Sequence, residues 1–337
     1  MSLTVSVVGF LVGAAVVGVC GVLLTARAEH LARVTGLGQA VMGAVFIGAT
    51  TSLSGLMTSA TAALAGHASL AASNSLGGIA IQTVFLAVAD MFYRRANLEH
   101  AAASEANLQQ CALLIVLLAV PLLAMATPEL QIGWVHPGSA ALIAAYVFGV
   151  RLVNQAHTRP MWRPRLTRET EREDDDSAPS EGVKLADWAV FGGLAAAVAA
   201  AGWVIARCAI ALSAELDLEE SLVGGVFTSI STSLPELVVA LAAVRRGALS
   251  LAVGDVLGGN AFDVLFLAVA DALYLGGSLY AAIGSDELIW MAVTILMAAI
   301  LQMGLLRREK HGFGNIGFES ALVLGVYGAA VAALVLS

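Results

Sequence analysis

The sequence predicts an all-α integral membrane protein in which ten transmembrane helices form two inverted repeats of five. Three observations lead to this prediction: an apolar composition, ten long hydrophobic stretches and an internal duplication. Of the 337 residues, 59% are hydrophobic and 12% are charged, whereas soluble domains average about 25% charged residues. The 34 glycines and the low aromatic content favour closely packed helices.

The hydrophobic stretches follow one another along the whole chain. A spanning helix needs about 20 mostly apolar residues, and division at charged and turn-forming clusters gives ten such stretches. The first lacks a basic segment before it, so we interpret it as a membrane helix and not as a cleaved signal peptide. We expect membrane helices at 3–26, 36–65, 69–93, 108–127, 134–153, 185–211, 220–244, 249–275, 286–306 and 316–336.

A long polar segment divides these stretches into two groups of five. Its charge and proline content predict a linker at 156–184, between a first membrane half at 1–155 and a second at 185–337. In this arrangement, 16 of the 17 basic residues fall on the linker's side of the membrane, the exception being Arg207. Because basic loops stay in the cytoplasm, we predict a cytoplasmic linker and two external termini, in a plasma membrane of bacterial type.

The duplication relates the two halves at a constant offset of 181 residues. SLAASNSLGGIAIQTVFLAVAD at 69–90 aligns with SLAVGDVLGGNAFDVLFLAVAD at 250–271, and 23 of the 51 positions from Gly43 to Tyr93 are identical. Because each half has an odd number of spans, the second half enters the membrane in the opposite orientation. Inverted repeats with interrupted helices are typical of secondary transporters, whose ion site lies near the midplane.

The motif SISTSLPELVV at 229–239 places a proline beside a carboxylate within an apolar stretch. Pro235 removes a backbone donor and interrupts a helix. Glu236 is costly at membrane depth unless it has a partner. An interruption beside a cavity frees carbonyl oxygens, and the carboxylate supplies negative charge at the same depth. The motif therefore predicts a cation site.

These residues resemble the cation/calcium exchanger superfamily, which includes sodium/calcium exchangers. The family repeat reads roughly G-[TS]-S-[LM]-P-E, then G-N-x-x-G-S-N-x-x-[ND]; here the second half has STSLPE at 231–236 and GDVLGGNAFD at 254–263. The resemblance implies a secondary active antiporter that moves Ca²⁺ or another cation against Na⁺ or H⁺ by alternating access. It implies inorganic cations and the lipid bilayer as partners, and no cofactor.

Carried over residue by residue, the resemblance implies cation ligands in both halves. Asp255 stands where the family has Asn, eight residues before Asp263 and near the same helical face. It is therefore a further candidate, the alternative being a helix-terminal residue near the cytoplasmic entry. The candidate ligands are Glu236, Asp263, Thr232, Ser233, Thr51, Ser52, Gln82 and Asp255.

The first half departs from the family pattern. Gly55 stands where the glutamate belongs, Ser54 replaces the proline, and Gly78 and Gly259 replace two serines. Ca²⁺ prefers six to eight oxygen ligands, usually with several carboxylates, so a monovalent or another divalent cation stays open. Two adjacent carboxylates raise each other's pKa, and we expect one to hold a proton when no cation is bound.

Two other classes of protein are alternatives to a transporter: a sensor or scaffold, and an intramembrane enzyme. A non-transporting sensor or scaffold that kept the fold stays open as an alternative. Intramembrane proteases need a membrane-embedded histidine or a G-x-G-D context, which this sequence does not offer, so no enzyme is predicted. The net charge of −8 gives no electrostatic reason to expect nucleic acid, and the oligomeric state is left open.

Overall fold

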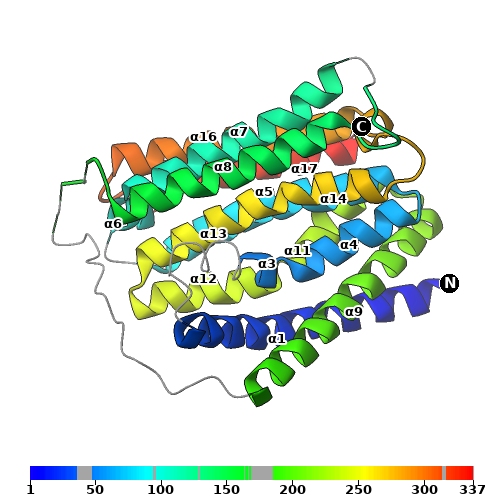
Figure 1. Ribbon diagram of the computed structural model, residues 1–337, viewed down its shortest axis with the longest axis horizontal. Helices are drawn as coiled ribbons and strands as arrows, with labels where there is room; N and C mark the ends of the chain where they lie inside the picture. Colours follow the sequence, from blue (N-terminus) through cyan, green and yellow to red (C-terminus); the bar gives the residue numbers. More distant parts are fainter. Residues whose placement is uncertain are drawn as a thin grey trace.

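The computed structural model describes residues 1–35, 48–93, 96–127, 130–162, 164–165, 167, 185–312 and 316–336. In these ranges the protein is helical, with one isolated β-bridge between Ile132 and Val135. Figure 1 shows long helices lying side by side, with both termini at the same end of the molecule and α8 ending at the other. We call these the terminus end and the linker end. The predicted all-α class is confirmed for the described residues.

Within the described ranges, the first half contains four long helices and three shorter ones. They are α1 (Leu3–Thr35), α3 (Gly48–Thr51), α4 (Leu53–Leu64), α5 (Ala68–Phe92), α6 (Leu98–Ala102), α7 (Glu105–Ala126) and α8 (Pro137–Thr158).

The second half repeats this order of long and short helices. They are α9 (Leu185–Leu216), α10 (Glu220–Leu222), the π-helix η2 (Val223–Thr228), α11 (Ser229–Thr232), α12 (Leu234–Arg246), α13 (Leu249–Asp263), α14 (Leu265–Leu273), α15 (Leu279–Ala282), α16 (Ser285–Arg307) and α17 (Phe318–Leu336).

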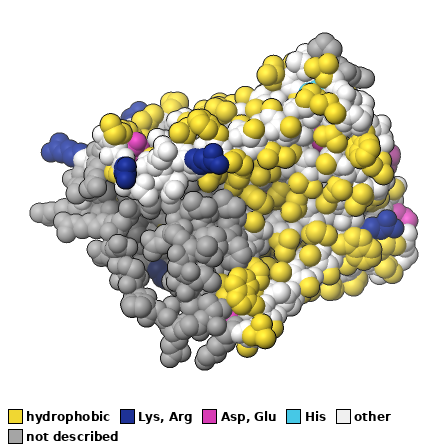
Figure 2. All heavy atoms as spheres, in the orientation of Figure 1, with side chains coloured by type: hydrophobic (Ala, Val, Ile, Leu, Met, Phe, Trp, Pro, Cys, Tyr) yellow, Lys and Arg dark blue, Asp and Glu magenta, His cyan; other side chains and the backbone are white. Residues whose placement is uncertain are grey.

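Eight helices of the described part are long and apolar enough to cross a membrane, or nine with one bent pair counted as a span. They match nine of the ten predicted stretches. The remaining stretch, 36–65, lies partly outside the described residues, and its described part forms the short helices α3 and α4. The count of ten therefore stays a prediction. The outer surface agrees with membrane insertion, because hydrophobic side chains cover the face between the two ends (Figure 2).

The predicted interruption at Pro235 is present. The segments Glu220–Thr232 and Leu234–Arg246 meet at 48°. Pro235 lies in the first turn of α12, where its missing N–H costs nothing because that donor has no partner inside the helix. The first half has a break at the matching position, between α3 and α4 at Ser52. Ser52 and Ser233 are separated by the same 181 residues as the sequence repeat.

Two aspartates make identical contacts at the same offset. Asp90 of α5 accepts hydrogen bonds from the backbone of Leu98 and from the start of α17, through Gly317 N and Ser320 Oγ. Asp271 of α14 does the same with the residues 181 positions away, namely Leu279 N, His136 N and Ser139 Oγ. Each aspartate is thereby fully paired, although both are buried.

The two most enclosed spans, α5 and the α13–α14 pair, carry the duplicated motif through the middle of the bundle. The helices α5 and η2 approach closely where Gly77 faces the backbone of Gly225, since a Cβ atom at Gly77 would overlap that backbone. Small residues permit this kind of contact between membrane helices. The close approach brings the broken helix of the second half against α5, where the candidate site lies.

Candidate cation site

A cavity of about 10 Å³ lies between the two broken helices (α3–α4 and α11–α12), α5, α13 and α14. This volume holds about one water-sized particle. Six of the eight candidate ligands line it, two from the first half and four from the second: Ser52, Gln82, Thr232, Ser233, Glu236 and Asp263.

Two carboxylates provide the negative charge of the cavity. Glu236 lies in the first turn of α12 and Asp263 at the end of α13, with 8% and 3% of their surface exposed. Oδ2 of Asp263 accepts a hydrogen bond from Gln82 Nε2 at 2.7 Å. Among the described residues, both oxygens of Glu236 and Oδ1 of Asp263 accept no hydrogen bond of normal geometry, although the hydroxyl of Ser52 lies near Asp263.

Two neutral oxygens of the cavity also have no hydrogen bond of normal geometry within the described ranges. They are Oγ of Ser52 and Oε1 of Gln82. Buried polar atoms are nearly always hydrogen-bonded, so five such oxygens around one cavity need an explanation. Carboxylate, amide and hydroxyl oxygens are the ligands that hard cations prefer. The arrangement can therefore bind a cation.

Hydrogen bonds between the two halves hold the walls of the cavity. Ser54 Oγ donates to the carbonyl of Thr232 at 2.9 Å, so the two helix breaks are tied to each other. Ser75 Oγ donates to the carbonyl of Asp263 at 2.6 Å. Each of these carbonyls lies at the end of a helix and has no hydrogen-bond partner within it. The two serine hydroxyls supply the missing partners.

Thr51 and Asp255 do not line the cavity. The hydroxyl of Thr51 donates to the carbonyl of Gly48 within α3. Asp255 is eight residues from Asp263 on α13, about 12 Å along a helix, and its charged neighbours are Glu29 and Arg246. Asp255 is the seventh of the 15 residues of α13, so it does not lie at a helix end. A ligand role of either residue remains a prediction.

Asn74, which is not among the predicted ligands, also lines the cavity. Its Nδ2 donates to the carbonyl of Gly55 and to Ser59 Oγ, and its Oδ1 accepts from Thr228 Oγ1 at 2.6 Å. Asn74 thus holds α4 and η2 against α5. The signal was available, because Asn74, Gly78 and Gln82 follow at intervals of four on one helical face.

An aromatic ring lies beside the position of the missing glutamate. A Cβ atom added to Gly55 would be 3.1 Å from Cε2 of Phe266 and 3.7 Å from Oγ1 of Thr232. Phe266 packs edge-on against Phe262, with ring centroids 6.0 Å apart, and Phe262 packs similarly against Tyr146. These contacts fix the ring of Phe266, which forms the wall of the cavity next to Gly55.

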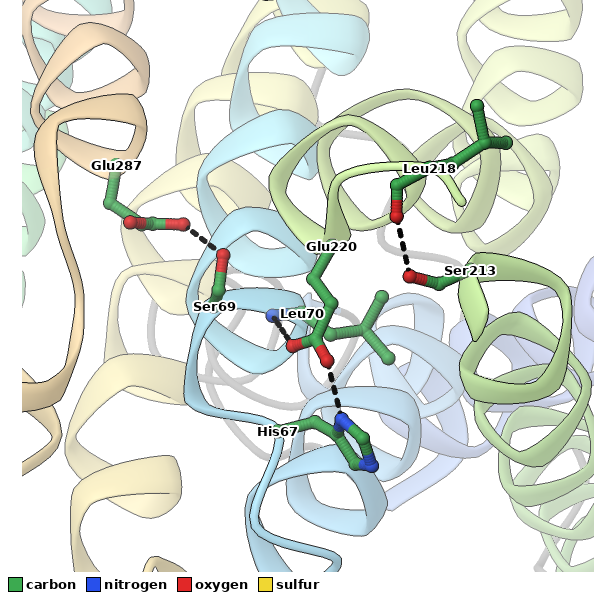
Figure 3. A network of polar contacts seen from close by, with 7 residues as sticks. All are labelled: His67, Ser69, Leu70, Ser213, Leu218, Glu220 and Glu287. Atoms are coloured by element: carbon green, nitrogen blue, oxygen red, sulfur yellow. Dashed lines mark hydrogen bonds and ion pairs between the residues drawn. The ribbon is translucent and has the colours of Figure 1, made fainter. Parts of the chain in front are cut away.

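A polar network fixes the start of α5 at the terminus end (Figure 3). Nδ1 of His67 lies 2.5 Å from Oε1 of Glu220, and Glu220 also accepts from the backbone of Leu70. Ser69 donates to the carboxylate of Glu287, at the start of α16. These contacts join α5 to α10 and α16, and so align the broken helix of the second half with the central helix.

A family model described as sodium/calcium exchanger protein matches residues 5–153 and 186–336. The chain belongs to this family. The match covers both halves and leaves out the linker, which confirms the resemblance stated from the motifs. This exchanger is accordingly an integral membrane protein of a cation antiporter family.

Relatives and solved structures agree with the family assignment. The exchanger is 27% identical over 292 residues to "Putative antiporter CaxA" of Alkalimonas amylolytica, covering 86% of this chain and 88% of the relative. It is 30% identical over 147 residues to the inner membrane protein YrbG of Escherichia coli, covering 40% and 45% of the two chains.

The fold is similar to that of two solved exchangers. A structure of the sodium-calcium exchanger NCX_Mj matches with a TM-score of 0.61 at 19% identity, over 98% of this chain and 99% of the other. The H⁺/Ca²⁺ exchanger CAX matches with a TM-score of 0.70 at 12% identity, over 98% and 86%. At these identities the likeness establishes the fold alone.

Proposed function

We propose that this exchanger moves Ca²⁺ or another cation against Na⁺ or H⁺, with Glu236 and Asp263 as the central ligands. The observation that carries the proposal is the set of five donor-free oxygens around one cavity of about 10 Å³. Two carboxylates balance the charge of one divalent cation. Ser52 and Gln82 supply neutral oxygens of the kind that such a cation needs.

The small number of carboxylates favours a weakly held, transported ion. Among the described residues, no group of three or more His, Cys, Asp and Glu side chains is arranged to hold a metal ion. An ion that must enter and leave a transport site has to be bound without being trapped. The same two carboxylates can take up protons when the cation leaves, which supports H⁺ as a coupling ion.

We further infer that the two halves form inverted repeats that work by alternating access. Matched breaks at Ser52 and Ser233 and the matched contacts of Asp90 and Asp271 support the repeat. Alternating access is supported by the pairing of α1 with α9, which share a small core separate from the main one. Gly21 of α1 packs directly on the ring of Pro235, so movement of this pair would cover or uncover the broken helix.

Flux measurements in proteoliposomes test the proposal. We expect uptake of at least one of Ca²⁺, Mg²⁺, Mn²⁺, Na⁺ and Li⁺ when a proton or sodium gradient is imposed, and none without the protein. Comparison of the two gradients identifies the coupling ion. Absence of gradient-driven flux for every cation, in protein that unfolds cooperatively, would favour the sensor or scaffold alternative.

The sidedness of the membrane gives a separate prediction. We expect a cysteine introduced at Ser177 to react with an impermeant thiol reagent only from the cytoplasm, and one at Ser337 only from outside. The reason is the concentration of 16 of the 17 basic residues on the linker's side. The native cysteines Cys20, Cys111 and Cys208 are replaced by serine or alanine first. Labelling of both positions from one side contradicts the proposed topology.

A further inference from the structure

A second group of buried carboxyl side chains lies at the linker end, outside the cation cavity. It consists of Asp90 at the end of α5, Glu99 in α6 and Glu319 at the start of α17, none more than 1% exposed. The adjacent His100 bonds to Thr167 of the linker, which places the group where the linker leaves the bundle. The proposed cation site does not use any of the three.

The members of this group are not equivalent. Asp90 accepts three hydrogen bonds and has an evident structural role. Both oxygens of Glu319 and Oε2 of Glu99 have no donor of normal hydrogen-bond geometry among the described residues. The carboxyl groups of Glu99 and Glu319 are near enough to interact with each other. Two ionised carboxylates in this position would repel, whereas one shared proton would join them.

The surroundings raise the pKa of Glu99 well above its ordinary value. Burial is the main cause, followed by the charge of Asp90 and then that of Glu319. Within the described part of the chain, the other titratable groups that interact with the pair are Cys111 of α7 and Glu309 after α16. The guanidinium of Arg308 is directed elsewhere, since it donates to the carbonyls of His100 and Arg165.

The backbone of α16 is shaped around the side chain of Glu319. A Cβ atom at Gly304 would be 2.6 Å from Cγ and 2.9 Å from Cδ of Glu319, and one at Gly317 would overlap its carboxyl group. The two glycines therefore form a cradle that an alanine would fill. The cradle holds the carboxyl group of Glu319 inside the protein, away from solvent.

The corresponding place at the terminus end contains no such pair. At the offset of 181, Glu99 matches Tyr280 and Glu319 matches Gly138. There the hydroxyl of Tyr280 lies 3.1 Å from Ser139 Oγ, and His136 packs on the tyrosine ring. The same contact between a short helix and a long one is thus made by neutral groups. The fold does not require two buried carboxyl groups at this position.

We propose that Glu99 and Glu319 form a proton-binding site that joins α6 to α17 at the linker end, and that loss of the shared proton loosens this end. The direction of the pH effect follows from the raised pKa of Glu99. A group whose pKa is raised by folding adds stability at low pH, and this stability is lost as the pH rises through its folded pKa. The packing of α6 against α17 at the linker end is therefore more stable at acidic pH than at alkaline pH.

Infrared titration of the purified full-length protein tests the proposal without any transport. We expect the carbonyl band of a protonated carboxyl group to persist at neutral pH and to disappear on alkalinisation. In a Glu236→Gln, Asp263→Asn background, which has no carboxyl group in the cation cavity, Glu99→Gln and Glu319→Gln should each remove this band. A band that is already absent at neutral pH, or that survives both substitutions, overturns the proposal. Since the infrared titration needs neither a gradient nor a transported ion, it can fail without affecting the proposed antiport, and the reverse also holds.

Thermal unfolding gives the second readout. We expect the Tm of the unmodified protein to fall between about pH 6 and pH 9, by about 2–4 °C or more beyond any fall in Glu99→Gln. In that variant the neutral amide still donates to Glu319 but has no proton to lose. Glu309→Gln is the matched control, because it removes a nearby charge but leaves both members of the pair in place, so a fall of Tm with rising pH should remain. Equal slopes in the unmodified protein and Glu99→Gln contradict a shared proton. Should Glu99→Gln fail to fold, Glu319→Gln and the infrared titration of the unmodified protein decide.

Discussion

Glu236→Gln is expected to abolish gradient-driven cation flux while the protein stays folded. The carboxylate of Glu236 is buried and its two oxygens have no donor among the described residues. The glutamine amide keeps the shape of the side chain and removes its charge, and a neutral amide is cheaper to bury than an unpaired carboxylate. Without cation, the thermal stability of the variant should therefore equal or exceed that of the parent.

Ligand-dependent stability separates loss of binding from loss of movement. A cation present at 100 times its Kd stabilises the folded state by about 2.7 kcal/mol, and we expect Glu236→Gln to lose this gain. Asp255→Asn is the matched control, because it removes a carboxylate of the same repeat that does not line the cavity. Transport by Glu236→Gln at the parental rate would contradict the proposed site. Loss of cation stabilisation in Asp255→Asn would indicate that Asp255 is a cation ligand.

The second large effect is expected at Gly55. Gly55→Glu alone should impair the protein, because its Cβ atom would already be 3.1 Å from the ring of Phe266, closer than an ordinary van der Waals contact. Combined with Phe266→Ala, the new carboxylate gains room and the cavity gains a third negative charge. We expect the double variant to bind Ca²⁺ at least tenfold more tightly than Phe266→Ala alone, measured by calcium titration at constant ionic strength.

Two comparisons make this test decisive. Gly55→Gln with Phe266→Ala has the same size without the charge, and should not show the gain in Ca²⁺ affinity. If Gly55→Glu alone already raises the affinity, Phe266 moves aside freely and does not exclude a ligand. If neither glutamate variant raises it, another group already supplies the missing charge. Ser54 is left unchanged, because its hydroxyl joins the two helix breaks through Thr232.

The helical class, the break at Pro235 and six of the cavity-lining residues could be predicted from the sequence, because each has a local signal. Proline and glutamate within an apolar stretch stand out against their surroundings. The break at Ser52 has no proline, and only the alignment of the two halves indicates it. Asp255 was harder to place, since the alignment with Asn74 gives its position on the helix but not the distance of that turn from the cavity.

The ring beside Gly55 and the pair of Glu99 and Glu319 could not be predicted in this way. Both depend on contacts between helices that lie far apart in the sequence, and such contacts leave no periodic pattern. Phe266 belongs to the motif FLAVAD, which is the same in the two halves, so the sequence gives no reason to connect it with the missing glutamate. From the sequence alone, a glutamate near a helix end is expected to be exposed, so the burial of Glu99 and Glu319 could not be predicted.

The contacts of Asp90 and Asp271 carry a consequence for the origin of the protein. Asp90 of the first half binds the start of α17 in the second, and Asp271 of the second half binds the start of α8 in the first. When residue i binds j and j binds i, the contact is that of a two-fold symmetric dimer. In the proposed inverted-repeat arrangement, a single half inserted into the membrane in both orientations would close both contacts with a copy of itself. Joining two such halves then requires only a linker, and the two copies are free to differ, as Gly55 and Glu236 do.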